Sequence, residues 1–80
     1  MHVIFTRHAL QQAALRGISR NDIIATLTGP DSTVPGDGGK FVAQKAHGSL
    51  LLRVVHRIES NGDVVVITAY KTSKAAKYQP

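Results

Sequence analysis

The stretch from Leu50 to Tyr70, LLLRVVHRIESNGDVVVITAY, decides the fold. Two apolar runs rich in β-branched residues flank Asn61-Gly62, and an Asn-Gly pair between such runs is the strongest short-range signal of a β-hairpin. A two-residue type I′ turn at this pair would fix the register of the two strands. The predicted cross-strand pairs are Ser60 with Asp63, Ile58 with Val65, His56 with Ile67, and Arg53 with Tyr70.

This register predicts two different faces, because side chains alternate between the two sides of a sheet. One face would carry Leu52, Val54, Ile58, Val65, Ile67 and Ala69, with His56 as its polar exception. The other face would carry Arg53, Val55, Arg57, Val66, Thr68 and Tyr70. We expect the first face to belong to the core and the second to carry functional side chains.

Two short helices are predicted before the hairpin. Thr6 is a good N-cap for a helix that starts at Arg7 and stops at Gly17. Ser19 would cap a second helix, which ends at Gly29-Pro30. Residues 2–5 could be a short edge strand or only a lead-in. The Pro- and Gly-rich residues 30–39 predict a loop in which residues 32–34 could pair briefly as an edge strand.

Residues 40–47 predict a further strand, whose register against the hairpin stays open. A two-residue loop at Gly48-Ser49 sets Gln44 opposite Arg53, whereas a three-residue loop brings Lys45 to the Arg53 face. The predicted fold class is α+β, with two short N-terminal helices packed on one face of a three- or four-stranded antiparallel sheet. Residues 1–80 would form a single domain, with a basic tail from about residue 71.

Composition points to an anionic partner. Ten Lys and Arg residues against five Asp and Glu give a net charge of +5 on 80 residues, so nucleic acid is the first expectation and an acidic protein the second. The chain has no cysteine, which excludes a disulfide scaffold and thiolate chemistry and agrees with a reducing, cytoplasmic setting. No apolar run approaches the ~18 residues of a membrane span. The carboxylates and histidines are dispersed, so neither a metal nor a cofactor is expected.

Cleavage of RNA without a metal needs groups that move protons and a cation that stabilises the phosphorane. His8 would lie in the first turn of the first helix, where the helix dipole favours a neutral, proton-accepting imidazole. The alternative for His8 is a solvent-facing stripe with Gln12 and Arg16. Arg53 lies in mid-strand without a carboxylate partner, which suits a phosphate, and Thr68 and Tyr70 share its face.

Four further cations are candidate nucleic-acid contacts: Lys45, Arg57, Lys71 and Lys74. Lys45 would reach the Arg53 face in only one of the two registers, and Lys71 and Lys74 would contact phosphates without sequence preference. His56 points to the core face, so packing is the favoured interpretation for it.

Several segments resemble the family described as domain of unknown function 4258: FTRHALQQAALRGIS, FVAQK, LLRVV and VVVITAYKTSKAAKY. The resemblance covers about residues 5–78, and its most specific parts are Arg7-His8 with Arg16-Gly17-Ile18, and residues 68–72. That family is similar to the RelE and BrnT toxins of the barnase, EndoU and RelE-like ribonuclease grouping. The resemblance implies a RelE/BrnT-like fold, RNA cleavage, and a site in or near His8, Arg53, Thr68 and Tyr70. Lys45 and Lys71 also match motif positions.

The sequence therefore predicts a small metal-independent endoribonuclease of toxin type, with RNA as substrate and an antitoxin or other acidic protein as partner. One alternative is a non-catalytic basic module that binds RNA or DNA. The other is a regulatory interaction protein with no nucleic-acid role.

Overall fold

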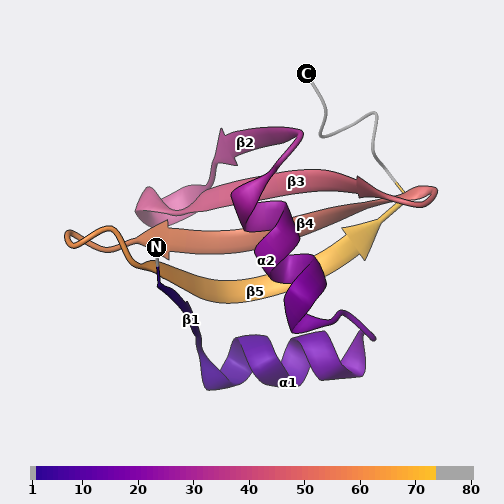
Figure 1. The fold of residues 1–80 in the computed structure, drawn as a ribbon, viewed down its shortest axis with the longest axis horizontal. Coiled ribbons are helices and arrows are strands. Elements are labelled where there is room, and N and C mark those ends of the chain that lie inside the picture. The colour runs from indigo at the N-terminus through magenta and orange to yellow at the C-terminus, as the bar shows by residue number, and fades with distance from the viewer. Residues whose placement is uncertain (1, 74–80) are drawn as a thin grey trace.

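A five-stranded sheet with strand order β1-β5-β4-β3-β2 forms the centre of the computed structural model, which describes residues 2–73. In chain order the elements are β1 (Val3–Phe5), α1 (Arg7–Leu15), α2 (Arg20–Thr28), β2 (Ser32–Pro35), the 3₁₀ turn η1 (Asp37–Gly39), β3 (Phe41–His47), β4 (Leu50–Ile58) and β5 (Val64–Thr72). In Figure 1, α2 crosses one face of the sheet and α1 runs along the edge beside β1 and β5. The basic tail predicted from residue 71 lies outside the described residues beyond Ser73.

The α+β class is confirmed, but the prediction of three or four antiparallel strands is wrong. The sheet has five strands, because β2 pairs with β3 at one edge and β1 pairs with β5 at the other. The β1–β5 pair is parallel, with Val3 beside Val64 and Phe5 beside Val66. A three-residue strand shows almost no alternation of its own, and its partner lies near the other end of the described chain. The sequence nearby therefore carries little sign of this pairing.

Both predicted helix starts are confirmed, because each is fixed by local capping. The hydroxyl of Thr6 accepts a hydrogen bond from the amide of Ala9 at 3.0 Å, and that of Ser19 accepts one from the amide of Asp22 at 3.0 Å. Gly17, at φ +65°, lets the chain turn back after α1 so that the Ile18 amide reaches the Ala13 carbonyl at 2.9 Å.

The core lies between the helices and one face of the sheet. It consists of Ala9, Ala13, Ile18, Ile23, Ala43, Leu52, Val54, Val66 and Ala69, with Val3, Phe5 and Leu27 packed around it. The small Ala9 and Ala13 let α1 lie close against β5. The opposite face of the sheet is not covered by α1 or α2, and we call it the open face, although Val42, Leu51 and Val65 on it are buried.

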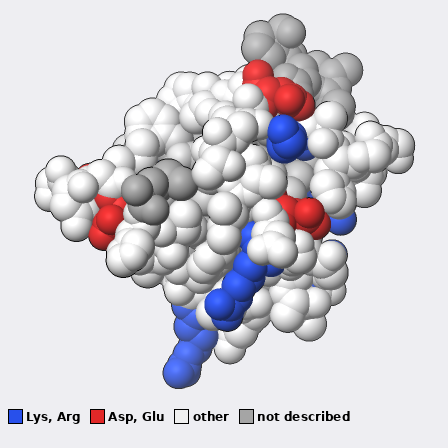
Figure 2. All heavy atoms as spheres, in the orientation of Figure 1, with Lys and Arg blue, Asp and Glu red and all other residues white. Residues whose placement is uncertain are grey.

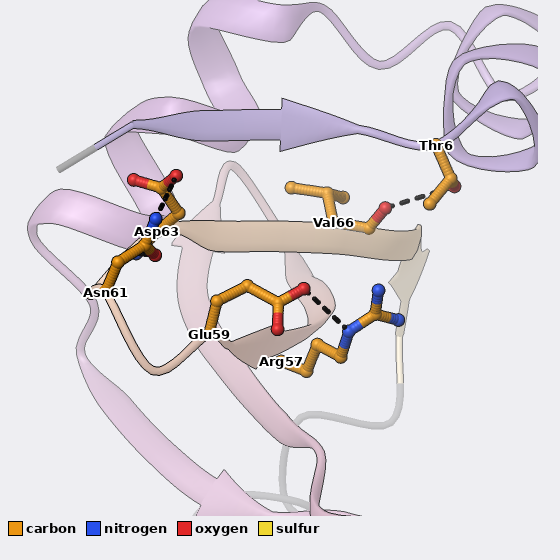
Figure 3. Close-up of polar contacts among 6 residues, drawn as sticks. All are labelled: Thr6, Arg57, Glu59, Asn61, Asp63 and Val66. Atoms are coloured by element: carbon orange, nitrogen blue, oxygen red, sulfur yellow. Dashed lines mark hydrogen bonds and ion pairs between the residues drawn. The ribbon is translucent and has the colours of Figure 1, made fainter.

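The β4–β5 hairpin contains the predicted Arg53–Tyr70 pair but not the predicted turn. The Glu59 amide donates to Asp63 O at 2.8 Å and the Gly62 amide donates to Glu59 O at 2.9 Å, which closes a three-residue loop. Only Gly62, at φ +90°, has a positive φ in this loop, so the type I′ turn is excluded. Figure 3 shows Asn61 and Asp63 bonded to each other across the loop.

The longer loop shifts the pairs near the turn by one residue. Ile58 pairs with Val64 rather than Val65, and His56 pairs with Val66 rather than Ile67. An irregularity between Val55 and His56, opposite the extra residue Ile67, restores the predicted register from Val55 onwards. Ser60 lies in the loop and does not pair with Asp63.

A one-residue shift exchanges the two faces of a strand, so part of the predicted core was wrong. Val66 is fully buried against the helices, while Val65, which is also buried at 5% exposed, lies on the open face opposite Arg57. Ile67 is only half-buried, and Ile58 is 56% exposed. Leu52, Val54 and Ala69 are core residues as predicted, and His56 is buried.

The β3–β4 hairpin takes the first of its two predicted registers. Gln44 pairs with Arg53, and the two residues Gly48 and Ser49 form the loop, with Gly48 at φ +63°. Lys45 consequently pairs with Leu52 and lies on the helix-covered face, away from Arg53.

Candidate functional site

A line of polar side chains crosses the open face from β2 to β5. Four residues that are cross-strand partners in register form it, one from each strand: Ser32, Gln44, Arg53 and Tyr70. We call these four residues the Arg53 ladder. The Arg53 Nε donates to Gln44 Oε1 at 2.9 Å, and the Gln44 Nε2 donates to Ser32 Oγ at 2.9 Å.

Burial gives the ladder its rigidity. Gln44 is 0% exposed and Arg53 is 9% exposed, which is unusual for an amide and a guanidinium. Such groups are stable inside a protein only when their donors and acceptors are paired. Among the described residues, every buried side-chain nitrogen and oxygen has a hydrogen-bond partner. The Arg53 side chain is therefore held in one orientation.

Arg53 and Tyr70 are the two ladder residues whose side chains could take part in a reaction. The Arg53 Nη1 donates to the Tyr70 hydroxyl, and the guanidinium carbon lies 5.6 Å from the centroid of the Tyr70 ring. The two side chains therefore touch through both a hydrogen bond and a cation–π contact. A guanidinium suits a phosphate, and a phenol is a proton carrier, so the pair joins two of the functions that phosphodiester cleavage needs.

Arg16 belongs to this region, although the sequence analysis placed it only in a solvent-facing stripe and in the resemblance, not in the candidate site. Its Nη1 donates to the carbonyl of Ala69 at 2.8 Å and to the Thr68 hydroxyl at 3.3 Å, so the C-terminal end of α1 is tied to β5 beside Tyr70. Thr68 is thus bonded to Arg16. Residues 16–18 and 68–72, two of the most specific parts of the resemblance, are in direct contact. This contact follows from the sheet topology. β1 pairs with β5 only as far as Val66, so Ala69 lies on an unpaired part of the β5 edge that Arg16 can reach.

His8 lies apart from the ladder. It is exposed in the first turn of α1, an end of the helix that Thr6 fixes to the Val66 carbonyl through its hydroxyl at 3.1 Å and its amide at 3.3 Å (Figure 3). Tyr70 lies four residues beyond Val66 along β5, and four residues of a strand span about 13 Å. The structure therefore brings Arg53 and Tyr70 together, and Thr68 near them, but not His8.

The predicted nucleic-acid contacts do not form one surface. Lys45 Nζ donates to the Gly29 carbonyl at 2.7 Å, where it satisfies the C-terminal end of α2, and Lys71 lies half-buried on the same helix-covered face. Arg57 shares the open face with Arg53 and forms an exposed ion pair with Glu59 at 3.2 Å (Figure 3). Lys74 lies outside the described residues.

The described part of the chain offers neither a cluster of ligands nor a cavity. Residues 2–73 contain no group of three or more His, Cys, Asp or Glu side chains that could hold a metal ion, and they enclose no pocket. None of the helices in this range has the length and apolar character needed to cross a bilayer.

The family described as Domain of unknown function (DUF4258) has a model that matches residues 5–71, most of the chain. No curated protein and no solved structure matches the chain significantly. The matched range includes α1, α2 and the four ladder strands β2 to β5, the last almost to its end, and so contains both Arg16 and the Arg53 ladder.

Proposed function

This chain belongs to the DUF4258 family, and on that premise we propose that it is a small metal-independent endoribonuclease of toxin type that acts on its open sheet face. The observation that carries the proposal is the contact between Arg53 and Tyr70, in the middle of rigid strands and in the orientation set by Gln44. Groups held by strands and by second hydrogen bonds are more exactly positioned than groups on loops.

The proposed reaction is attack of an RNA 2′-oxygen on the adjacent phosphorus, with departure of the 5′-oxygen. The Arg53 guanidinium would stabilise the extra negative charge of the phosphorane. Electrostatic stabilisation of this kind is usually the largest single contribution to catalysis. Tyr70 would exchange a proton with the 2′-hydroxyl or the leaving 5′-oxygen. The products would be a 2′,3′-cyclic phosphate and a free 5′-hydroxyl, so no redox step or metal is needed.

Two other predicted residues take different parts in this proposal. Thr68 would orient the phosphate or hold β5 in place through Arg16, to which it is bonded. His8 would be the second proton carrier only for a substrate that bends around the β5 edge, because α1 begins on the other side of that strand from Tyr70. Single variants of His8 and Tyr70 therefore separate the two candidate proton carriers.

The direct test is cleavage of a fluorescent RNA oligonucleotide by purified protein in EDTA. Tyr70→Phe removes only the hydroxyl, and we expect it to lower the cleavage rate by about a hundredfold or more, the usual effect of losing an acid–base group. Product analysis should find a 2′,3′-cyclic phosphate. RNA with a 2′-O-methyl group at the cleaved position should stay intact, because it lacks the nucleophile.

Thr33→Val is the matched control, since it removes an exposed β2 hydroxyl that lies outside the ladder. It should cleave at the rate of the unaltered protein. Equal rates for Tyr70→Phe and the unaltered protein, with both folded, would exclude Tyr70 from the chemistry. A large loss in His8→Ala instead would move the reaction to the α1 edge.

A non-catalytic module that binds RNA or DNA is the second candidate. The distance of His8 from the ladder favours this alternative. Cleavage needs one group that removes a proton and one that donates a proton, and Tyr70 is the candidate that the ladder supplies. Under this alternative the RNA would remain intact while binding weakens steeply with salt. The cleavage assay in EDTA distinguishes the two candidates directly.

A toxin of this type would also need a partner that blocks it. We propose an acidic antitoxin that covers the open face, because the net charge of +5 favours association with an acidic protein. Such a partner would act in the cytoplasm, where the RNA substrate is found.

A further inference from the structure

The N-terminal quarter of the chain is positively charged, and its charged side chains do not belong to the Arg53 ladder. Residues 2–21 contain Arg7, Arg16 and Arg20 but no Asp or Glu. Arg16 is directed to β5 by its hydrogen bonds, which leaves Arg7 and Arg20 as the two remaining arginines of this segment. Both are exposed.

Arg7 and Arg20 belong to the same small region although they come from different helices. The guanidinium carbon of Arg20 lies 5.6 Å from the centroid of the Phe5 ring, and Arg7 is two residues after Phe5 at the start of α1. Stacking on an aromatic ring restricts the Arg20 side chain while its hydrogen-bond donors stay exposed to solvent. We call Arg7 and Arg20 the α1-edge arginines.

No carboxylate neutralises the α1-edge arginines within residues 2–73. The described ion pairs are His47–Asp22 at 3.4 Å and Arg57–Glu59 at 3.2 Å, so even Asp22, which is close to Arg20 in sequence, pairs elsewhere. In Figure 2, Lys and Arg atoms project from the lowest part of the molecule, where Figure 1 shows α1, and no Asp or Glu atoms lie beside them there. The positive potential of this edge is therefore not cancelled locally.

We propose that the α1-edge arginines bind the phosphate backbone of a single-stranded nucleic acid. Two guanidinium groups without carboxylate partners suit phosphate oxygens, which they can contact through two parallel hydrogen bonds. An acidic protein is less favoured, because protein interfaces centre on apolar anchors. Two exposed large hydrophobic residues belong to the elements that hold Phe5 and Arg20: the alternation of β1 directs Ile4 to the face opposite Phe5, and Ile24 of α2 is only 37% exposed.

This surface is separate from the Arg53 ladder and does not depend on cleavage. Its test is fluorescence anisotropy with a labelled 20-nucleotide single-stranded DNA, which has no 2′-hydroxyl and cannot be cleaved by the proposed route. In Arg7→Gln/Arg20→Gln we expect a roughly tenfold or greater loss of affinity at low salt. The plot of log affinity against log salt should become shallower by about 1.4, the value for two lost phosphate contacts on a single strand.

Lys40→Glu is the matched control, because it lowers the net charge of +5 by the same two units at a site before β3. Its affinity should fall by much less than that of the double variant. Arg7→Lys/Arg20→Lys keeps both charges and should keep the salt dependence. If the double glutamine variant does not fold, Arg7→Gln and Arg20→Gln are tested singly, and each should make the slope shallower by about 0.7. Tyr70→Phe should bind the DNA like the unaltered protein, whatever its effect on cleavage.

Three results would overturn the proposal. Equal losses in Lys40→Glu and the glutamine variant would show that only overall charge matters. An unchanged affinity in the glutamine variant would exclude the α1-edge arginines. Binding to polyglutamate but not to DNA would identify an acidic protein as the partner of this edge.

Discussion

At the scale of single residues, Gln44 is the residue on which the Arg53 ladder depends. Its amide oxygen accepts from Arg53 and its amide nitrogen donates to Ser32, so one side chain connects three strands. A buried guanidinium that loses an acceptor keeps the full cost of its desolvation. The orientation of Arg53 toward Tyr70 therefore depends on an amide that takes no part in any chemistry.

Replacing Gln44 tests this dependence. Gln44→Leu has a similar volume but leaves the Arg53 Nε and the Ser32 hydroxyl without this partner, and we expect the free energy of unfolding to fall by about 1–3 kcal/mol. Urea denaturation measures the change. Gln11→Leu, at an exposed position of α1, is the control and should stay within about 0.5 kcal/mol. Similar values for both variants would show that the Gln44 contacts add little to stability.

The sequence contained part of this site. The Arg53–Tyr70 pair was predicted from a type I′ turn that the structure does not have, and it is present because the irregularity opposite Ile67 restores the register. The Gln44–Arg53 pair was one of two predicted registers, and the ladder itself follows only once that register is known. Arg16 could not be found in this way, since its partners on β5 are 52 and 53 positions away in the chain.

At the scale of elements, the loop of the β4–β5 hairpin determines which residues of β5 reach the core. Gly62 takes φ +90°, a conformation that costs a residue with a Cβ about 1–2 kcal/mol. This loop and the extra residue Ile67 act together: one shifts the register, and the other shifts it back.

Gly62→Ala should therefore destabilise the protein by about 1–2 kcal/mol, measured by thermal or urea unfolding. Nothing lies within 4 Å of the added Cβ, so the whole effect would come from the backbone. Gly36→Ala provides the comparison, because its φ is −113° and its new Cβ would be 3.5 Å from its nearest neighbours, an ordinary contact. It should be neutral or slightly stabilising. A neutral Gly62→Ala would mean that the loop can take another conformation.

The elements that were predicted correctly are those with local causes. Thr6 and Ser19 start their helices through hydrogen bonds to residues three positions away, so the local sequence is sufficient to predict both helix starts. The β1–β5 pair and the irregularity opposite Ile67 depend instead on packing between distant segments. An Asn-Gly pair also permits more than one loop length, so the type I′ turn was a reasonable but wrong choice.

At the scale of the whole molecule, the open face and the α1 edge lie on different sides of β5, so two surfaces could contact one polymer. If the chain is a ribonuclease toxin, its induced expression in a bacterial host should arrest growth and cleave cellular RNA. His8→Ala/Arg53→Ala should abolish both effects. His8→Ala alone should still arrest growth, because His8 is remote from the ladder.

The growth experiment requires equal amounts of soluble protein, which immunoblotting of the lysates establishes. Arrest by the double variant without RNA cleavage would indicate toxicity through binding. No arrest by the unaltered protein would contradict the toxin proposal.

The parallel pairing of β1 with β5 has a consequence for the order of folding. Thr6 bonds to Val66 across 60 positions, so β1 and the start of α1 have no place to dock until β5 has been synthesised. Contacts of such long range slow the folding of small domains, and segments that are synthesised early stay unpaired until their partners are made. During translation the hairpins β2–β3 and β3–β4 can form first, while the arginine-rich N-terminal segment stays undocked. A growing chain would therefore complete the sheet described for residues 2–73, and any activity that requires it, only as β5 emerges.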